Sequence, residues 1–190
     1  YRLVNGNLCL GEVECIRSGL HLASDIELLQ SGKHPGKINI TDADAALNVL
    51  RYLTDRPATV IIKHNNPCGV AVAETLEESY RKAYYADRVA AFGGAVAVNR
   101  ELDLATAEQI ASSYSEVVVA PGYAPGTVER LSSRKNLRIM EIGNMDRLRE
   151  FVGADVVEFK SLIDGGLVVQ WSQTPRVAAP ADFVPARVER

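Results

Sequence analysis

The chain has 190 residues, 47% of them hydrophobic and 24% charged, which is typical of a globular protein with a real hydrophobic core. A formal net charge of -3 and the lack of an apolar run near ~20 residues argue against a nucleic acid or a membrane as partner. The three cysteines, Cys9, Cys15 and Cys68, do not suggest a disulfide framework and fit a reducing, cytoplasmic compartment. The chain begins with Tyr1 instead of Met, so we expect it to be a portion of a longer polypeptide.

The N-terminal third combines turn and helix signals. Residues 1–12 alternate around an Asn-Gly pair and predict a hairpin. Residues 24–29 predict a short helix with a Ser or Asp cap. A longer helix is predicted over about 43–54, after the acidic residues Asp42 and Asp44. These two carboxylates lie two positions apart and would not share a helix face, so helix capping is the default interpretation of the pair.

The rest of the chain alternates between strand and helix signals, with no internal repeat. Strands are predicted at 58–62, 94–98, 117–120, 137–142, 156–159 and 167–170, and helices at about 75–87, 104–113 and 125–131. Residues 65–69 are typical of a loop. Short alternating strands and helices predict an α/β layer fold over residues 1–170, followed by an extended tail or linker at 171–190.

The most informative residues are Lys63 and His64, which follow the predicted strand 58–62. Ligands of open α/β sheets bind beyond the carboxyl ends of strands, so this pair stands where a sheet presents reactive groups. The ammonium group disfavours a second positive charge, which keeps the imidazole neutral and able to act as a base. It can also stabilise negative charge on a nearby oxygen. Taken alone, however, a Lys-His pair at a strand end is more often a solvated terminus.

Cys68 allows two sharper interpretations, neither of which the sequence supports. A catalytic thiol would need an activating base, and none is assigned. A deaminase-type zinc site would need His-x-Glu and Pro-Cys-x-x-Cys, but the segment 67–71 lacks the second cysteine. We therefore expect no metal and a packing role for Cys68. The Gly93-Gly94 pair could bring backbone amides close to a ligand, although most such pairs are simply turns.

Six segments, in the same order along the chain, resemble the transformylase domain of a family of bifunctional purine-biosynthesis enzymes that are also IMP cyclohydrolases. They are Asn39-Ile40-x-Asp42-x-Asp44-Ala45-Ala46-Leu47, Lys63-His64-x-Asn66-Pro67-Cys68-Gly69-Val70-Ala71, Ala91-Phe92-Gly93-Gly94, Asn99-Arg100-Glu101-Leu102-Asp103, Glu116-Val117-Val118-Val119-Ala120-Pro121 and Gly165-Gly166-Leu167-Val168-Val169-Gln170. The ordered set covers about residues 38–170 and is far more specific than any single segment.

The resemblance implies a three-layer α/β/α fold, cytidine-deaminase-like and without zinc. It also implies formyl transfer from 10-formyltetrahydrofolate to the 5-amino group of aminoimidazolecarboxamide ribonucleotide (AICAR), by a homodimer or with a companion half-domain. By position His64 would be the base, and Lys63 would stabilise the oxyanion or help to protonate the departing folate nitrogen. The implied substrate-binding positions are Asn39, Asn66, Phe92, Gly93 and Glu116, with Asn66 acting chiefly by shaping the turn.

The chain also departs from that family. Residues 1–12 show no Arg-Tyr-Gly-x-Asn-Pro-His-Gln-like opening, which in the family helps to hold the nucleotide. The family's second half supplies a catalytic Asn, a further His and most of the folate pocket, and it is not in this sequence. The alternative function is therefore a short nucleotide-binding relative or regulatory subunit without folate chemistry. A weaker alternative is an unrelated α/β protein with a chance Lys-His turn.

Overall fold

The computed structural model describes residues 9–10, 13–14, 22–23, 26–154, 157–164 and 166–171. They belong to two compact units, a larger one drawn from Ile16–Val152 and a smaller one drawn from Cys9–Cys15 and Gly153–Arg190. The predicted hairpin at 1–12 falls mostly outside the described residues, as does the predicted tail beyond residue 171. Within the described part, no helix is both long and apolar enough to cross a membrane.

The larger unit is built on a six-stranded sheet with the order β3-β8-β7-β6-β4-β5. The central strands β6, β7 and β8 are parallel, whereas β4 runs antiparallel to β6 and to its edge neighbour β5. The strands are β3 (Glu27–Gln30), β4 (Ala58–Lys63), β5 (Asn66–Val72), β6 (Ala95–Val98), β7 (Val117–Ala120) and β8 (Arg138–Glu141). The carboxyl end of β4 therefore lies at the same edge of the sheet as the amino ends of β6, β7 and β8.

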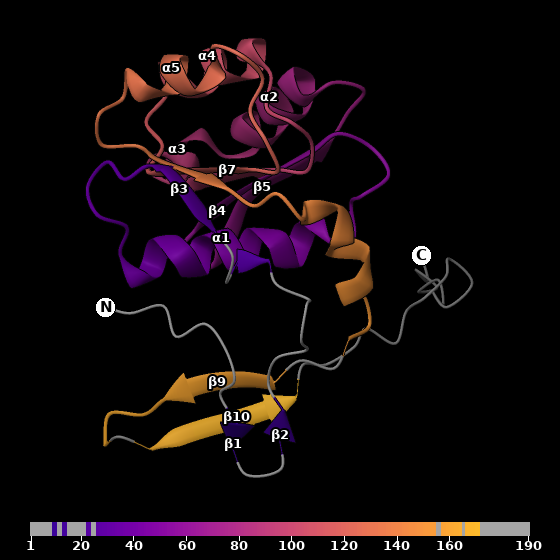
Figure 1. Cartoon of the computed structure of the whole chain (residues 1–190), viewed down its shortest axis with the longest axis vertical. Helices are drawn as coiled ribbons and strands as arrows, with labels where there is room; N and C mark the ends of the chain where they lie inside the picture. The colour runs from indigo at the N-terminus through magenta and orange to yellow at the C-terminus, as the bar shows by residue number, and fades with distance from the viewer. Residues whose placement is uncertain are drawn as a thin grey trace, which may run out of the picture. The chain divides into compact units, whose positions relative to one another are not determined.

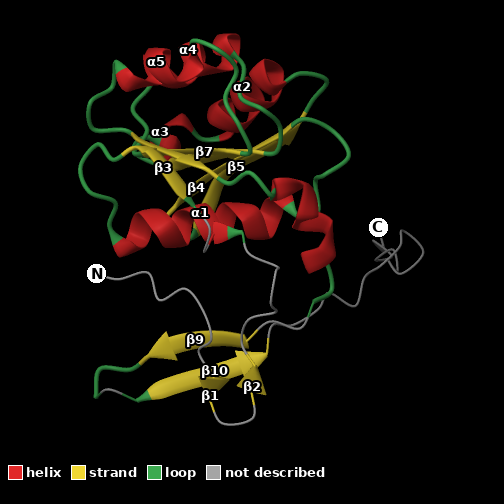
Figure 2. Ribbon diagram, viewed as in Figure 1, coloured by secondary structure: helices red, strands yellow, loops and turns green. Residues whose placement is uncertain are grey.

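Helices cover both faces of this sheet (Figures 1 and 2). They are α1 (Lys37–Leu50), α2 (Leu76–Ala86), α3 (Arg88–Ala91), α4 (Leu104–Ser112), α5 (Thr127–Ser132) and the 3₁₀ helix η2 (Met145–Phe151). In β6, Ala95 and Ala97 pack in the core beneath α1, while Val96 and Val98 pack in the core beneath α2 and α4. This alternation, which follows from the two-residue period of a strand, confirms the predicted three-layer α/β/α arrangement.

Two helices on one face of the sheet begin at side-chain caps. Thr75 accepts a hydrogen bond from the Glu78 backbone N–H at the start of α2, and Asp103 accepts one from Thr106 at the start of α4. The predicted start at Pro125 is two residues early, because α5 begins at Thr127 after Gly126.

The smaller unit contains two antiparallel strand pairs. In one, β1 (Cys9–Leu10) pairs with β2 (Val13–Glu14), and in the other, β9 (Val157–Ser161) pairs with β10 (Leu167–Trp171). The second pair confirms the two strands predicted from the last apolar runs of the chain.

Three local predictions were wrong. Residues 24–29 were predicted as a short helix, but residues 27–30 form the edge strand β3, because pairing with β8 satisfies their backbone groups. Helix α1 begins at Lys37, where the Asn39 side chain accepts a hydrogen bond from the Gly36 N–H at 2.7 Å. Asp42 and Asp44 therefore lie inside the helix and do not cap it.

The third correction concerns residues 65–69, which were predicted as a loop. Most of them belong to β5, whose register with β4 shifts between Ile61 and Ile62 so that Cys68 is the extra residue of a bulge. Pro67 is tolerated because it lies beside that bulge on an edge strand. At Gly69 an added Cβ would come within 1.9 Å of the Ala83 carbonyl oxygen, so β5 packs directly against α2.

Candidate functional site

The Lys-His pair occupies the tight turn between β4 and β5. Lys63 pairs with Asn66, which leaves His64 and Asn65 as a two-residue loop. Both loop residues have positive φ angles, 55° at His64 and 63° at Asn65, as a type I′ hairpin turn requires. Residues other than glycine rarely adopt this backbone conformation, so the surrounding structure must hold the turn in place.

Asp42 on α1 provides that support. Its Oδ1 accepts the Asn65 backbone N–H at 2.7 Å and its Oδ2 accepts the His64 backbone N–H at 3.2 Å. The Asn65 side-chain amide lies 3.1 Å from Asp42 Oδ1 and from two oxygens of Thr41, so its nitrogen faces these acceptors. Asn66 completes the turn by donating from Nδ2 to the His64 carbonyl at 2.9 Å.

Lys63 reaches from this turn to the segment that precedes β6. Its Nζ donates to the Phe92 carbonyl at 2.7 Å, which fixes the direction of the side chain and leaves further ammonium protons for a ligand. The Phe92 ring is 60% exposed and packs on Tyr114, with ring centroids 4.9 Å apart. Together the two rings form an exposed aromatic surface beside the Lys63 ammonium group.

Gly93 brings the backbone close to this aromatic pair. It has a φ of 76°, and its N–H donates to the Tyr114 carbonyl at 2.9 Å. A Cβ at this position would lie 3.4 Å from the Tyr114 ring and 4.0 Å from Glu116 Oε1. Glycine therefore satisfies an unusual backbone conformation and also keeps the approach to Glu116 open.

Glu116, directly before β7, joins three elements. Its Oε2 accepts a hydrogen bond from Asn39 Nδ2 at 3.3 Å and lies 3.7 Å from the Arg138 guanidinium at the start of β8. Asn39 and Arg138 are buried, whereas the Glu116 side chain is 39% exposed. The carboxylate is thus held from behind and presents its free edge to solvent.

The structure brings the predicted site positions together at the edge where β4 ends and β6, β7 and β8 begin. These positions are Asn39, Lys63, His64, Asn66, Phe92, Gly93 and Glu116. The rule that ligands bind at carboxyl strand ends describes β4 only, because the parallel strands present their amino ends here. Sequence analysis missed Tyr114 and Arg138. Arg138 carried one signal, a basic residue at the start of a buried strand, and Tyr114 carried none.

A profile of the family described as the AICARFT/IMPCHase bienzyme matches residues 16–185. The chain belongs to this family. Among its relatives, the bifunctional purine biosynthesis protein PurH of Myxococcus xanthus is 51% identical over 112 residues, which cover 59% of this chain and 22% of that protein. PurH of Bacillus mycoides is 39% identical over 158 residues, covering 83% of this chain and 30% of that protein. PurH of Streptococcus suis is 41% identical over 159 residues, covering 80% and 29%. The chain therefore spans less than a third of the length of these relatives.

In this family member, Cys68 has the surroundings of a packing residue. It is partly buried against the core beneath α2. Burial raises the pKa of the Cys68 thiol; Lys63 opposes this shift, while Asp87 and Asp42 add to it. A raised pKa favours the unreactive thiol over the thiolate. In the part of the chain that the structure describes, no three His, Cys, Asp or Glu side chains gather as a metal site would require.

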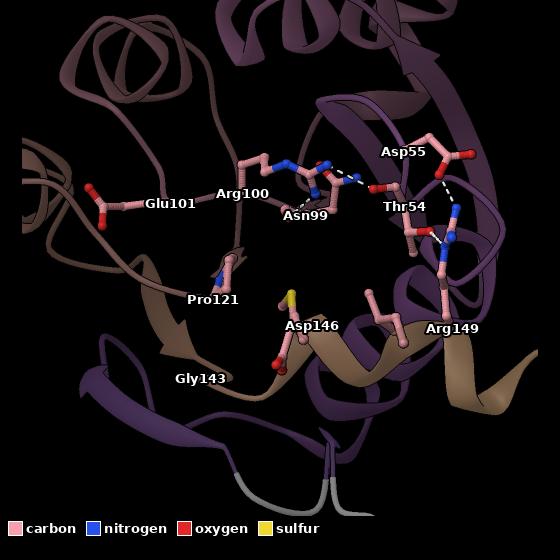
Figure 3. Close-up of a pocket in the computed structure, with 11 residues that line it drawn as sticks. Thr54, Asp55, Asn99, Arg100, Glu101, Pro121, Gly143, Asp146 and Arg149 are labelled. Carbon is pink, nitrogen blue, oxygen red and sulfur yellow. Dashed lines mark hydrogen bonds and ion pairs between the residues drawn. The ribbon is translucent and has the colours of Figure 1, made fainter.

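A pocket of about 540 Å³ lies at the other edge of the sheet from the Lys-His turn. Figure 3 shows the residues that line it. The pocket is lined by residues that follow β6, β7 and β8, including Asn99, Pro121 and Gly143, and by Thr54 and Asp55 before β4. This is the carboxyl-end edge of the parallel strands, where the general rule would place a ligand.

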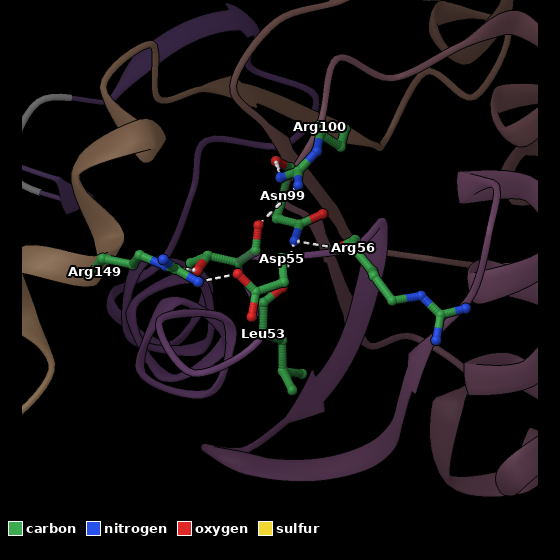
Figure 4. A network of polar contacts seen from close by, with 7 residues as sticks. Leu53, Asp55, Arg56, Asn99, Arg100 and Arg149 are labelled. Carbon is green, nitrogen blue, oxygen red and sulfur yellow. Dashed lines mark hydrogen bonds and ion pairs between the residues drawn. The ribbon is translucent and has the colours of Figure 1, made fainter.

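Several polar groups of this pocket are held by the surrounding backbone or by one another (Figure 4). Asn99 accepts from the Ala58 N–H at 2.8 Å and donates to the carbonyls of Leu53 and Arg56 at 2.7 and 2.9 Å. Arg149 pairs with Asp55 and also donates to Thr54. The network ties the connection between α1 and β4 to the end of β6, and it therefore has a structural explanation.

Proposed function

We propose that this chain carries the AICAR-binding and Lys-His portion of an AICAR formyltransferase of purine biosynthesis. The observation that carries the proposal is the clustering, in a member of this family, of the Lys63–His64 turn with Phe92-Gly93 and the Asn39–Glu116 pair. The formyl donor is 10-formyltetrahydrofolate. Because the chain spans 22–30% of its relatives, the folate pocket and the other catalytic groups come from outside this sequence, in a longer homodimeric protein.

The reaction needs a base close to the substrate amine. The 5-amino lone pair of AICAR is delocalised into the imidazole carboxamide, so the amine is a poor nucleophile until its proton is removed. His64 is exposed at the tip of the turn, and within the described residues its imidazole makes no hydrogen bond. It is therefore free to accept that proton, aided by the substrate's own carboxamide.

Lys63 complements the base. As the amine nitrogen forms a bond to the formyl carbon, negative charge develops on the formyl oxygen, and an ammonium group held nearby stabilises it. The bond between the formyl carbon and N10 of the folate then breaks, and the departing nitrogen takes up a proton. The hydrogen bond from Lys63 Nζ to the Phe92 carbonyl holds the ammonium group in a fixed direction before the substrate binds.

The remaining positions suit a nucleotide. The solvent-facing edge of the Glu116 carboxylate can accept hydrogen bonds from ribose hydroxyls, as acidic residues do in other nucleotide sites. The exposed rings of Phe92 and Tyr114 offer an apolar surface for a planar heterocycle. Gly93 lets the backbone approach the ligand.

The proposal is tested by calorimetric titration of AICAR into the wild-type protein and a Lys63→Ala/His64→Ala variant, followed by a formyl-transfer assay on the full-length protein. Arg149→Ala, on the opposite edge of the sheet, is the matched control. We expect the double variant to lose transfer and to bind AICAR more weakly, and the control to match the wild type. Unchanged binding and transfer in the double variant would contradict the proposal. AICAR binding without any transfer by the full-length wild type would instead support the nucleotide-binding relative.

A further inference from the structure

Asp42 has no role in the chemistry described so far, yet its contacts centre on the Lys-His turn. Asp42 is 7% exposed and lies inside α1. Each of its two oxygens accepts one backbone N–H of the turn, Oδ1 from Asn65 and Oδ2 from His64. A buried carboxylate is stable when such donors satisfy it, and hydrogen bonds to a charged acceptor are stronger than neutral ones.

The residues on either side of this contact explain why it matters for the site. Asn39 and Asp42 are three positions apart and so lie on the same face of α1. Asn39 holds Glu116, while Asp42 holds the turn. One helix face therefore sets the distance between the carboxylate proposed to bind the nucleotide and the imidazole proposed to act as base.

The geometry points to Asp42 as a positioning residue for His64. Resting on the proposed function, we infer that Asp42 fixes the left-handed backbone of His64 and Asn65, so that the imidazole meets the substrate amine in one orientation. Lys63 is fixed separately by its bond to the Phe92 carbonyl. Loss of the Asp42 carboxylate would thus free the His64 imidazole from its fixed orientation while leaving the nucleotide contacts in place.

The key variant is Asp42→Asn, which keeps the shape of the side chain but replaces one of its two acceptor oxygens with an NH₂ group. An amide offers one acceptor oxygen, and its NH₂ group would face the second turn N–H as donor against donor. We expect kcat for formyl transfer in the full-length protein to fall about 10- to 100-fold, because small misplacements of a catalytic group have effects of this size. The KM for AICAR should change by less than about 3-fold. Amide hydrogen exchange at His64 and Asn65 should become faster in the same protein.

The matched control is Asp44→Asn, on the same helix. Asp44 is exposed, and its hydrogen bonds are to Asn48 within the helix. We expect this variant to retain wild-type kcat and wild-type exchange at the turn. Thermal unfolding of both variants shows whether either has lost its fold, and Asp42→Ser, which retains a single small acceptor, provides a second test if Asp42→Asn unfolds.

A rescue experiment separates positioning from the simple effect of charge. Asn65→Gly supplies, at one of the two left-handed positions, a residue that adopts a positive φ without support, and so it lowers the dependence of the turn on Asp42. Added to Asp42→Asn, it should recover at least about 5-fold in kcat, while alone it should change kcat little.

Three results would overturn the inference. Wild-type kcat in Asp42→Asn with faster exchange at His64 would show that the turn contact does not act on the reaction. A loss of kcat that Asn65→Gly does not recover would assign the effect to the charge of Asp42. Full activity in His64→Asn, which preserves the turn conformation, would show that His64 is not the base, and Asp42 could then have no role in positioning it. Amide exchange at the turn would still report whether Asp42 holds the turn. Failure of the proposed function and failure of this inference are therefore distinguishable.

Discussion

The two edges of the central sheet differ in how their polar groups are used. At the amino-end edge, Lys63, His64 and Glu116 are each held from one side and keep unused donors or acceptors facing outward. At the carboxyl-end edge, a pocket is lined in part by groups engaged in internal contacts: Asn99 uses both of its amide hydrogens and its amide oxygen on the backbone, and Arg149 pairs with Asp55.

This difference shows that a pocket and a set of side chains with unused hydrogen-bonding groups can lie at opposite edges of one sheet. The pocket contains the Arg149–Asp55 ion pair and the hydrogen bonds of Asn99, which tie neighbouring segments of the chain together. The amino-end edge has unused acid-base and hydrogen-bonding capacity. The comparison predicts that substitutions at one edge alter function, whereas those at the other alter stability.

The largest effect is expected from His64→Asn. Asparagine tolerates the left-handed backbone of the turn, so the fold should persist, but the variant has no general base. Formyl transfer in the full-length protein should fall about 10²- to 10⁴-fold, with a midpoint of thermal unfolding close to that of the wild type. A clear fall in the unfolding temperature of His64→Asn would contradict the difference between the two edges, because the amino-end edge would then be structural as well.

The second effect is expected from Asn99→Ala at the opposite edge. The variant leaves the Ala58 N–H and the Leu53 and Arg56 carbonyls without their partner. Since unsatisfied buried groups are costly, the free energy of unfolding should fall by about 3 kcal/mol, as measured by urea denaturation. AICAR affinity of the folded protein should stay within about 2-fold of wild type; a selective loss of affinity would make the pocket part of the site.

A smaller functional effect is expected from Glu116→Gln. The amide oxygen can still accept from Asn39, but the ion pair with Arg138 is lost and ribose hydroxyls meet a neutral acceptor. Calorimetry should show AICAR binding weakened about 10-fold, with little change in unfolding temperature. Unaltered binding would separate Glu116 from the nucleotide.

The smallest effect is expected from Arg149→Ala. Its ion pair with Asp55 is solvent-exposed, with 63% and 79% of the two side chains accessible. Exposed pairs contribute little, so the unfolding free energy should change by less than about 1 kcal/mol and transfer should not change. A clear drop in formyl transfer would show that the carboxyl-end edge contributes to the reaction.

Much of the fold could be predicted from local patterns. The apolar runs that became β4, β6, β7 and β8 and the helix signals of α2 and α4 are properties of neighbouring residues, and the structure confirms these elements. Strands β3 and β5 were missed because their sequences carry turn or helix signals. Their strand conformation depends on partners distant in the chain, and β5 in addition contains a bulge at Cys68.

Local sequence patterns were enough to predict the layered α/β architecture, the family, and the positions of Lys63 and His64 at the end of a strand. They could not show that β4 runs against its parallel neighbours, since strand direction is settled only when the sheet assembles. That reversal places the Lys-His turn beside residues that precede β6 and β7. It also brings Asp42, which looked like a helix cap, beneath the turn, because a buried carboxylate must find donors and the nearest are the turn's own N–H groups.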